Sequence, residues 1–175
     1  MRRGASAVLT LATAGALTGC GNWITTDIVG AIAMTADAQG NPVVIVARCG
    51  APIDMVEVSQ HPDVASATGG PDADPIVLRL TAPEPPNDVF TVSLTDPGPP
   101  WQAEGRFDPA AQEMFWVSGA VSDKDMATTV TQVTRAAYEG LDAEHVVIRE
   151  GEVWTRAEFD ARACNRESWP VVTES

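Results

Sequence analysis

Residues 76–95 of the 175-residue chain read IVLRLTAPEPPNDVFTVSLT, and this stretch decides the expected fold. It contains two segments, 76–81 and 90–95, in which apolar residues alternate with mostly polar ones. Successive side chains of a β-strand point to opposite faces, so this alternation predicts two strands that are each buried on one face. The prolines between them cannot donate to a sheet, which predicts a loop at the end of antiparallel strands.

Further short strands are expected on both sides of this stretch. They lie at residues 28–34, 43–47, 53–58, 114–121 and 128–134, with a short edge strand at 146–148. The run at 43–47 is apolar throughout, which predicts a strand buried on both faces. Residues 59–75 are polar and rich in turn formers and are expected to be a surface loop, and 136–141 is expected to form a single helical turn. Seven or eight short strands separated by Gly and Pro turns are typical of an antiparallel β-sandwich.

The C-terminal part of the chain predicts one short helix. Thr155 and Glu158 have the spacing of a capping box, in which each side chain satisfies a free amide at the helix start. The helix is expected to run from Arg156 to Cys164, with Phe159 and Ala163 on one face. The expected fold class is therefore mainly β, an antiparallel sandwich with a short C-terminal helix.

The segment 107–121 is similar to the middle of fibronectin type III domains, although its spacing of aromatic residues to proline differs. The Cys, Trp and Cys arrangement of immunoglobulin domains is absent, because Cys164 falls in the predicted helix. The sandwich is thus immunoglobulin-like or fibronectin III-like at most, and the strand order stays open.

The amino terminus has the pattern of an export signal. Arg2 and Arg3 are followed by residues 5–17, which carry no charge and are rich in Ala and Leu. A short cationic start before an apolar run is typical of a secretory signal. Thirteen residues are too few for a membrane-spanning helix, which needs about 20 predominantly apolar residues.

Leu17-Thr18-Gly19-Cys20 resembles the lipobox of bacterial lipoproteins. The resemblance implies that the Cys20 thiol accepts a diacylglyceryl group, and that a signal peptidase then cuts between Gly19 and Cys20. The alternative is an uncleaved anchor helix, since residues 4–26 contain no charge; however, its many Gly, Thr, Ser and Ala residues insert weakly.

The lipoprotein interpretation divides the chain into four parts. Residues 1–19 are the signal peptide, 20–27 the lipidated N-terminus and a short tether, 28–166 a single β-rich domain, and 167–175 a tail. The expected location is the outer face of the cytoplasmic membrane, with attachment through lipid on Cys20. The lipobox, the sequence GNPVV at 40–44 and the downstream cysteine also resemble small secreted actinobacterial lipoproteins, a likeness that implies no activity.

Export to an oxidising compartment predicts a disulfide between Cys49 and Cys164, the two remaining cysteines. Two buried free thiols or a metal site are the alternatives. A metal site has little support, because His61 and His145 are the only histidines and lie in unrelated segments.

The charge of the chain argues against nucleic acid as a partner. The formal net charge is −13, and the loss of Arg2 and Arg3 with the signal leaves 9 basic against 24 acidic residues, a net charge of −15. Such a surface repels phosphate backbones and anionic headgroups, so membrane attachment depends on the lipid. The acidity indicates solubility, with an acidic recognition surface as the alternative.

Recognisable catalytic motifs are absent, and we assign no catalytic residues, metal ligands or cofactors. His61 and His145 are expected to be exposed or capping residues rather than bases. Asp72-x-Asp74 and Asp123-x-Asp125 supply oxygen ligands of the kind that calcium takes, but neither continues into an EF-hand loop. With 24 carboxylates in the chain, the presence of two near each other carries no information.

Two functions remain open. Trp101 and Trp169 lie in predicted loops, where exposed tryptophans beside carboxylates can hold sugars, although tryptophan is more often a packing residue. We expect a non-enzymatic module that binds an envelope protein, a glycan or a small ligand. The alternative is an envelope hydrolase that acts on cell-wall or polysaccharide substrates through a carboxylate pair.

Overall fold

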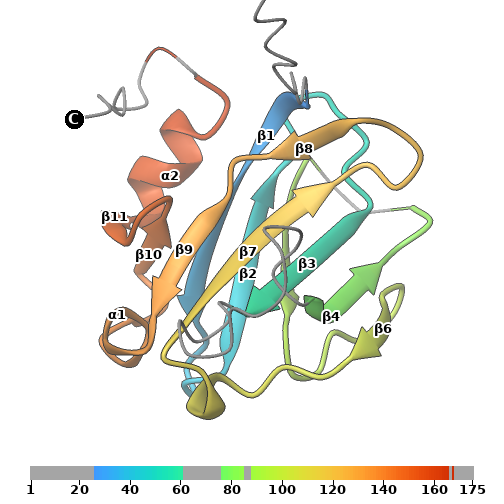
Figure 1. Cartoon of the computed structure of the whole chain (residues 1–175). Helices are drawn as coiled ribbons and strands as arrows, with labels where there is room; N and C mark the ends of the chain where they lie inside the picture. The colour runs from blue at the N-terminus through green and yellow to red at the C-terminus, as the bar shows by residue number, and fades with distance from the viewer. Residues whose placement is uncertain (1–25, 61–75, 85–87, 166, 168–175) are drawn as a thin grey trace, which may run out of the picture.

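The computed structural model describes residues 26–60, 76–84, 88–165 and 167, which form a mainly β structure with two short α-helices (Figure 1). The described strands are β1 (Asp27–Ala36), β2 (Pro42–Ala47), β3 (Met55–Gln60), β4 (Ile76–Thr81), β5 (Val89–Ser93), β6 (Gln102–Gly105), β7 (Met114–Ala120), β8 (Met126–Thr128), β9 (Thr131–Thr134), β10 (His145–Ile148) and β11 (Glu152–Thr155). The helices are α1 (Arg135–Glu139) and α2 (Arg156–Arg162), and a 3₁₀ turn covers Pro109–Ala111. The predicted class, mainly β with a short C-terminal helix, is confirmed.

Several predicted features lie outside the described residues. They are the signal segment 1–19, Cys20, most of the loop 59–75 and nearly all of the tail 167–175. Among the residues that are described, no helix is long and apolar enough to cross a membrane.

All strands belong to one sheet, which follows the order β11-β10-β1-β8-β7-β3-β4-β6. In addition, β2 pairs with β1 and β5, and β9 pairs with β7. The pairs are antiparallel except for β1 with β8, which is parallel. The sheet curls, so that β1, β2 and β5 face β3, β4 and β7 across the main core, as Figure 1 shows.

The alternating strands bury every second side chain in this core. The buried residues of β3, β4 and β7 that belong to it are Val56, Val58, Leu78, Leu80, Phe115 and Val117, each at most 2% exposed. Their neighbours in sequence point outward, to the other face of the sheet. The face predicted from the alternation at 76–81 is therefore the core face.

Strand β2 is buried on both faces, as its continuous apolar run predicts. Val44 and Val46 lie in the main core, whereas Ile45 and Ala47 lie in a second cluster on the opposite face. Phe159 of α2 closes that second cluster and is completely buried. The predicted capping box is present: the Thr155 hydroxyl accepts from the Glu158 N–H, and the Glu158 carboxylate accepts from the Thr155 N–H.

Two strand predictions are wrong, and two strands, β6 and β11, were not predicted. The expected single strand over 128–134 is divided, because the chain leaves β1 after Thr128 and continues as β9 beside β7. The expected edge strand at 146–148 is internal, since β10 lies between β1 and β11. All four residues of β6 are exposed; the strand pairs with β4 through the backbone, and its Glu104 lies 3.8 Å from Arg79 in an ion pair. In β11 only Trp154 is buried, so neither strand shows an apolar alternation.

Threonine side chains complete one edge of β1. Residues 30, 32 and 34 direct their backbone polar groups to the edge opposite β2, where β8 pairs up to Gly30 and β10 pairs from Ala33. At Ile32, between these partners, the N–H donates to Thr129 Oγ1 (3.4 Å) and the carbonyl accepts from Thr131 Oγ1 (2.8 Å). Thr131 Oγ1 also accepts from the backbone N–H of Arg149 (3.3 Å). The hydroxyls of Thr129 and Thr131 thus supply the two hydrogen bonds that a neighbouring strand would otherwise make to Ile32.

We expect Thr131→Val to lower the free energy of unfolding by about 1–3 kcal/mol, because it leaves the buried Ile32 carbonyl without a donor. Thr131→Ser retains the hydroxyl and removes one methyl group, so we expect a loss of about 1 kcal/mol or less. Urea unfolding of the two variants measures the difference. If the valine variant is as stable as the serine variant, the hydroxyl does not hold this edge.

Candidate functional site

Two neighbouring cavities open where β1 changes its partner from β8 to β10. The first has a volume of about 310 Å³ and the second about 430 Å³, and both fall in the range of 300–1,000 Å³ that is usual for ligand pockets. Thr129 and Arg149 line both of them. We call the first the apolar cavity, the second the mixed cavity, and the two together the groove.

The apolar cavity has mostly hydrocarbon and sulfur walls. Besides the two shared residues, it is lined by Ile28, Val29, Gly30, Cys49, Ala163 and Cys164. Gly30 is required at its place, because a Cβ there would lie 2.6 Å from the Ala47 carbonyl oxygen. The start of β1 therefore runs close to the end of β2, and the cavity lies beside this contact.

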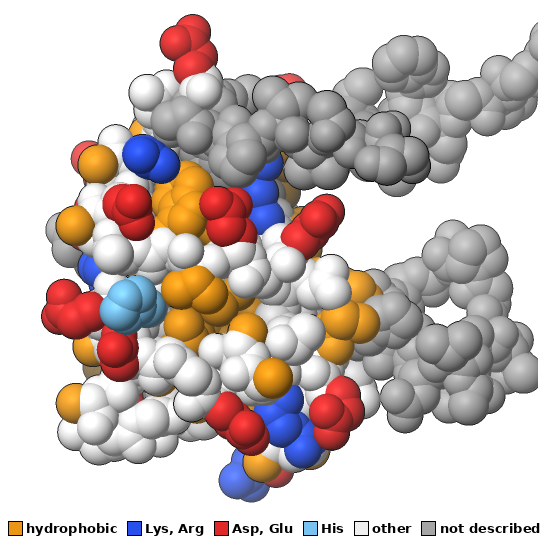
Figure 2. Space-filling model, turned by 90° about the vertical axis from the view of Figure 1, so that its left-hand side faces the viewer, with side chains coloured by type: hydrophobic (Ala, Val, Ile, Leu, Met, Phe, Trp, Pro, Cys, Tyr) orange, Lys and Arg blue, Asp and Glu red, His pale blue; other side chains and the backbone are white. Residues whose placement is uncertain are grey.

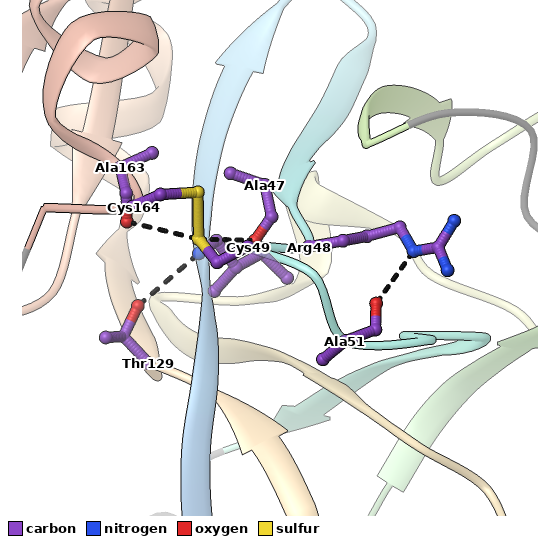
Figure 3. The surroundings of a disulfide bond; sticks show 8 residues. Ala47, Arg48, Cys49, Ala51, Thr129, Ala163 and Cys164 are labelled. Carbon is purple, nitrogen blue, oxygen red and sulfur yellow. Dashed lines mark hydrogen bonds between the residues drawn. A yellow bond between two sulfur atoms is a disulfide. The ribbon is translucent and has the colours of Figure 1, made fainter.

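The disulfide forms one wall of the apolar cavity. Cys49 and Cys164 are bonded, with their Cα atoms 5.2 Å apart, and the predicted pairing is confirmed. Figure 3 shows that the bond joins the turn after β2 to the end of α2, with Thr129 nearby. The Cys49 sulfur lies 3.6 Å from the carbonyl oxygens of Ala47 and Ala163. The bond thus fixes the end of α2 against the main sheet.

The β10–β11 turn brings Arg149 and Glu150 to the mixed cavity. Arg149 and Gly151 both have positive φ angles, 45° and 87°, which allow the tight reversal between the two strands. The Arg149 backbone also bonds to β9, since its N–H donates to Thr131 and its carbonyl accepts from the Gln132 N–H. Backbone contacts on both sides of the residue therefore set the position of the turn.

Trp116 and Gln132 form another wall of the mixed cavity. They are paired across β7 and β9, and both point outward because Phe115, Val117 and Val133 are buried in the core. Val130, which also lines this cavity, is 52% exposed. The mixed cavity thus combines an indole ring, an amide, a guanidinium and a carboxylate with one exposed apolar side chain.

His145 lies away from the groove and closes a turn. Its Nδ1 is 2.8 Å from the Asp142 carboxylate, which also accepts from the backbone N–H groups of Glu144 and His145. These hydrogen bonds, that of His145 first, lower the pKa of Asp142. Thr155 pairs opposite His145 in the sheet, but its hydroxyl belongs to the capping box of α2. The His–Asp pair therefore has a structural role in the turn.

The other residues singled out from the sequence lie apart from the groove. Trp101 is 9% exposed and packs in the core against Phe90, so it does not form a surface platform. Asp125 accepts from the Thr26 hydroxyl (2.9 Å). Ser122 bonds to Asp54 through both its N–H and its hydroxyl. No group of three or more potential metal ligands occurs within the ranges described above. His61, Asp72, Asp74 and Trp169 lie outside those ranges.

The sequence analysis missed Trp116, Gln132, Arg149 and Glu150. One signal was available for Trp116: it stands on the outward face of a strand whose alternate residues are apolar, where a large aromatic residue has no core to fill. The remaining residues converge only through the break between β8 and β9, which the alternation at 128–134 does not reveal.

Comparison of the chain with protein-family models, with curated proteins and with solved structures finds no match.

Reduction of the disulfide should lower the stability of the protein substantially. The bond joins residues 115 positions apart, and in the chain-entropy model a loop of this length contributes roughly 4–5 kcal/mol. We expect a clear fall in the urea midpoint after reduction, measured on the purified protein with and without reductant.

The double variant Cys49→Ser/Cys164→Ser is the control. It should match the reduced protein and should not respond to reductant. Free thiols that titrate in the denatured, unreduced protein would contradict the bond.

Proposed function

We propose that this protein is a cell-envelope lipoprotein, held at the outer face of the cytoplasmic membrane by lipid on Cys20, whose domain binds a ligand rather than catalysing a reaction. The lipid part rests on the cationic start, the apolar run and the lipobox, which follow one another in the order that export requires. The binding part rests on the groove.

The anchor and the groove are close to each other along the chain. Cys20 precedes Ile28, which lines the apolar cavity, by eight residues, and a fully extended chain of that length spans at most about 29 Å. A lipid on Cys20 therefore keeps this end of the domain near the membrane surface. A site at this end meets ligands in or just above the outer leaflet.

The groove is the single observation that supports binding most directly. It is open, it has the volume of a ligand site, and it combines apolar walls with a few polar groups, as small-molecule sites do. Among the described residues that line its two cavities, Glu150 is the one carboxylate. Glycoside hydrolysis in most families needs two facing carboxylates about 5–9.5 Å apart, so the envelope hydrolase has less support.

Mass spectrometry of the mature amino terminus tests the anchor. We expect the first residue to be Cys20 carrying a diacylglyceryl group, with the signal peptide removed. In cells that make Cys20→Ser, we expect a precursor that is heavier by the signal peptide and lacks the lipid. An unmodified Cys20 in the wild-type protein rules out the anchor.

Carbene footprinting tests binding at the groove. We expect Val130 to be labelled less in the native envelope than in the purified lipoprotein, because a bound ligand covers it. Val153 is a matched internal control: it is 53% exposed, against 52% for Val130, and it lines neither cavity. We expect equal labelling of Val153 in both preparations.

Equal labelling of Val130 in both preparations would contradict the binding proposal. The purified lipoprotein should also be assayed on peptidoglycan and polysaccharides. If the wild-type protein hydrolyses one of these substrates and the Glu150→Gln variant does not, the protein is a hydrolase and the binding proposal is wrong.

A further inference from the structure

We infer that the groove binds a glycolipid-like amphiphile, with one alkyl chain in the apolar cavity and an uncharged sugar headgroup in the mixed cavity. This inference rests on the proposed binding function and deepens it by naming the class of ligand. The two cavities differ in their walls, they meet at shared residues, and the mixed cavity carries charges of both signs.

The two cavities differ in the chemistry of their walls. Ile28, Val29, Ala163 and the disulfide make most of the wall of the apolar cavity apolar, and its polar side chains are Thr129 and Arg149, which it shares with the mixed cavity. An alkyl chain fits the apolar part of this wall, because it needs no hydrogen-bond partners. The mixed cavity is lined by Trp116 together with Gln132 and Glu150. A sugar ring has an apolar C–H face that stacks on an indole, and hydroxyls that each donate and accept hydrogen bonds.

One molecule can occupy both cavities. Thr129 and Arg149 line the apolar and the mixed cavity alike, so the two meet at these residues. An amphiphile whose chain and headgroup are joined end to end has the same arrangement. A free sugar would leave the apolar cavity open to water, and a plain alkane would not use the hydrogen-bonding side chains that line the mixed cavity.

The charges of the mixed cavity favour an uncharged headgroup. Arg149 and Glu150 are adjacent in the chain and line it together, so their opposite charges cancel and the pair has no net charge that would favour an anionic or a cationic headgroup. The acidic surface opposes an anion further: Figure 2 shows acidic side chains spread over the face that carries α2, around patches of apolar ones. Hydroxyl groups can bond to both charged residues without bringing in a charge that must lose its water.

Photocrosslinking with three matched amphiphiles tests the inference. The mature lipoprotein is placed in phosphatidylcholine nanodiscs with dodecyl probes that carry the same diazirine in the chain and a maltoside, a carboxylate or a trimethylammonium headgroup. We expect the maltoside probe to label the peptides that contain residues 28–30 and 163–164. It should do so about tenfold more than either charged probe, because a charged headgroup would lose water there without meeting a net opposite charge.

Substitutions in the mixed cavity sharpen the test. Trp116→Ala should reduce labelling by the maltoside probe several-fold, whereas its urea midpoint should show that the domain is still folded. Glu150→Lys should shift the preference toward the carboxylate probe. Glu139→Lys makes the same charge change on α1, at an exposed residue outside the groove, and should leave all three probes unchanged.

The outcomes separate this inference from the proposed function. Equal labelling of the groove by all three probes overturns the sugar headgroup and leaves the binding function in place. If no probe labels the groove while Val130 is protected in the envelope, the amphiphile is wrong and a protein or peptide partner replaces it. If no probe labels the groove and Val130 is not protected, both proposals fail. The measured mass of the amino-terminal peptide shows whether Cys20 carries lipid, whichever of these labelling outcomes is found.

Discussion

The hydrogen bonds of Thr129 and Thr131 to Ile32 are the contacts on which the arrangement of the sheet depends. An internal strand needs a partner for every backbone N–H and carbonyl, because an unpaired polar group inside a protein destabilises it by about 1–3 kcal/mol. Strand β1 has β2 along one edge, but its other edge is shared between β8 at the start and β10 further on. The threonine hydroxyls fill the interval between those partners. They let the chain leave β1 after Thr128 and continue as β9 beside β7. Strand β8, which pairs with both β1 and β7, connects the two layers into one curled sheet.

The departure of the chain from β1 also explains why a groove exists at this place. A continuous strand along β1 would cover the edge and close the surface, whereas the departure of the chain at Thr129 leaves a gap between β8 and β10. The gap stays open because each of its sides is held by a different contact. Gly30 lies close to Ala47, and the disulfide holds the end of α2. The backbone of Arg149 is held by its hydrogen bonds to β9. Such fixed walls favour binding, because little conformational entropy is lost when a ligand enters a preformed site.

Much of the fold could be predicted from the sequence, wherever a local pattern carried the information. The alternation at 76–81 fixed the buried face of β4, the continuous run at 43–47 indicated a strand between two clusters, and the Thr155–Glu158 spacing gave the start of α2. The disulfide followed from the number of cysteines and the expected compartment. By contrast, β6 has no buried residue and so leaves no apolar pattern. The groove could not be predicted for a different reason. It forms at the break between β8 and β9, within the stretch 128–134, and it brings together residues more than 100 positions apart, such as Ile28 and Arg149.

The groove residues fall into two groups with different freedom to vary. Gly30, Thr129, Cys49 and Cys164 line the groove and also hold the sheet or the terminal helix, so a change in any of them alters the fold as well as the site. Val130 and Glu150 are exposed residues of connecting segments, and substitutions at such positions usually change stability by less than about 0.5 kcal/mol. Trp116 and Gln132 point outward from paired strands, where a side chain can change without disturbing the core. The side chains of the mixed cavity can therefore change at little cost in stability, whereas the apolar cavity is tied to the fold. This division predicts that related domains would keep the apolar cavity and differ in the polar end of the groove.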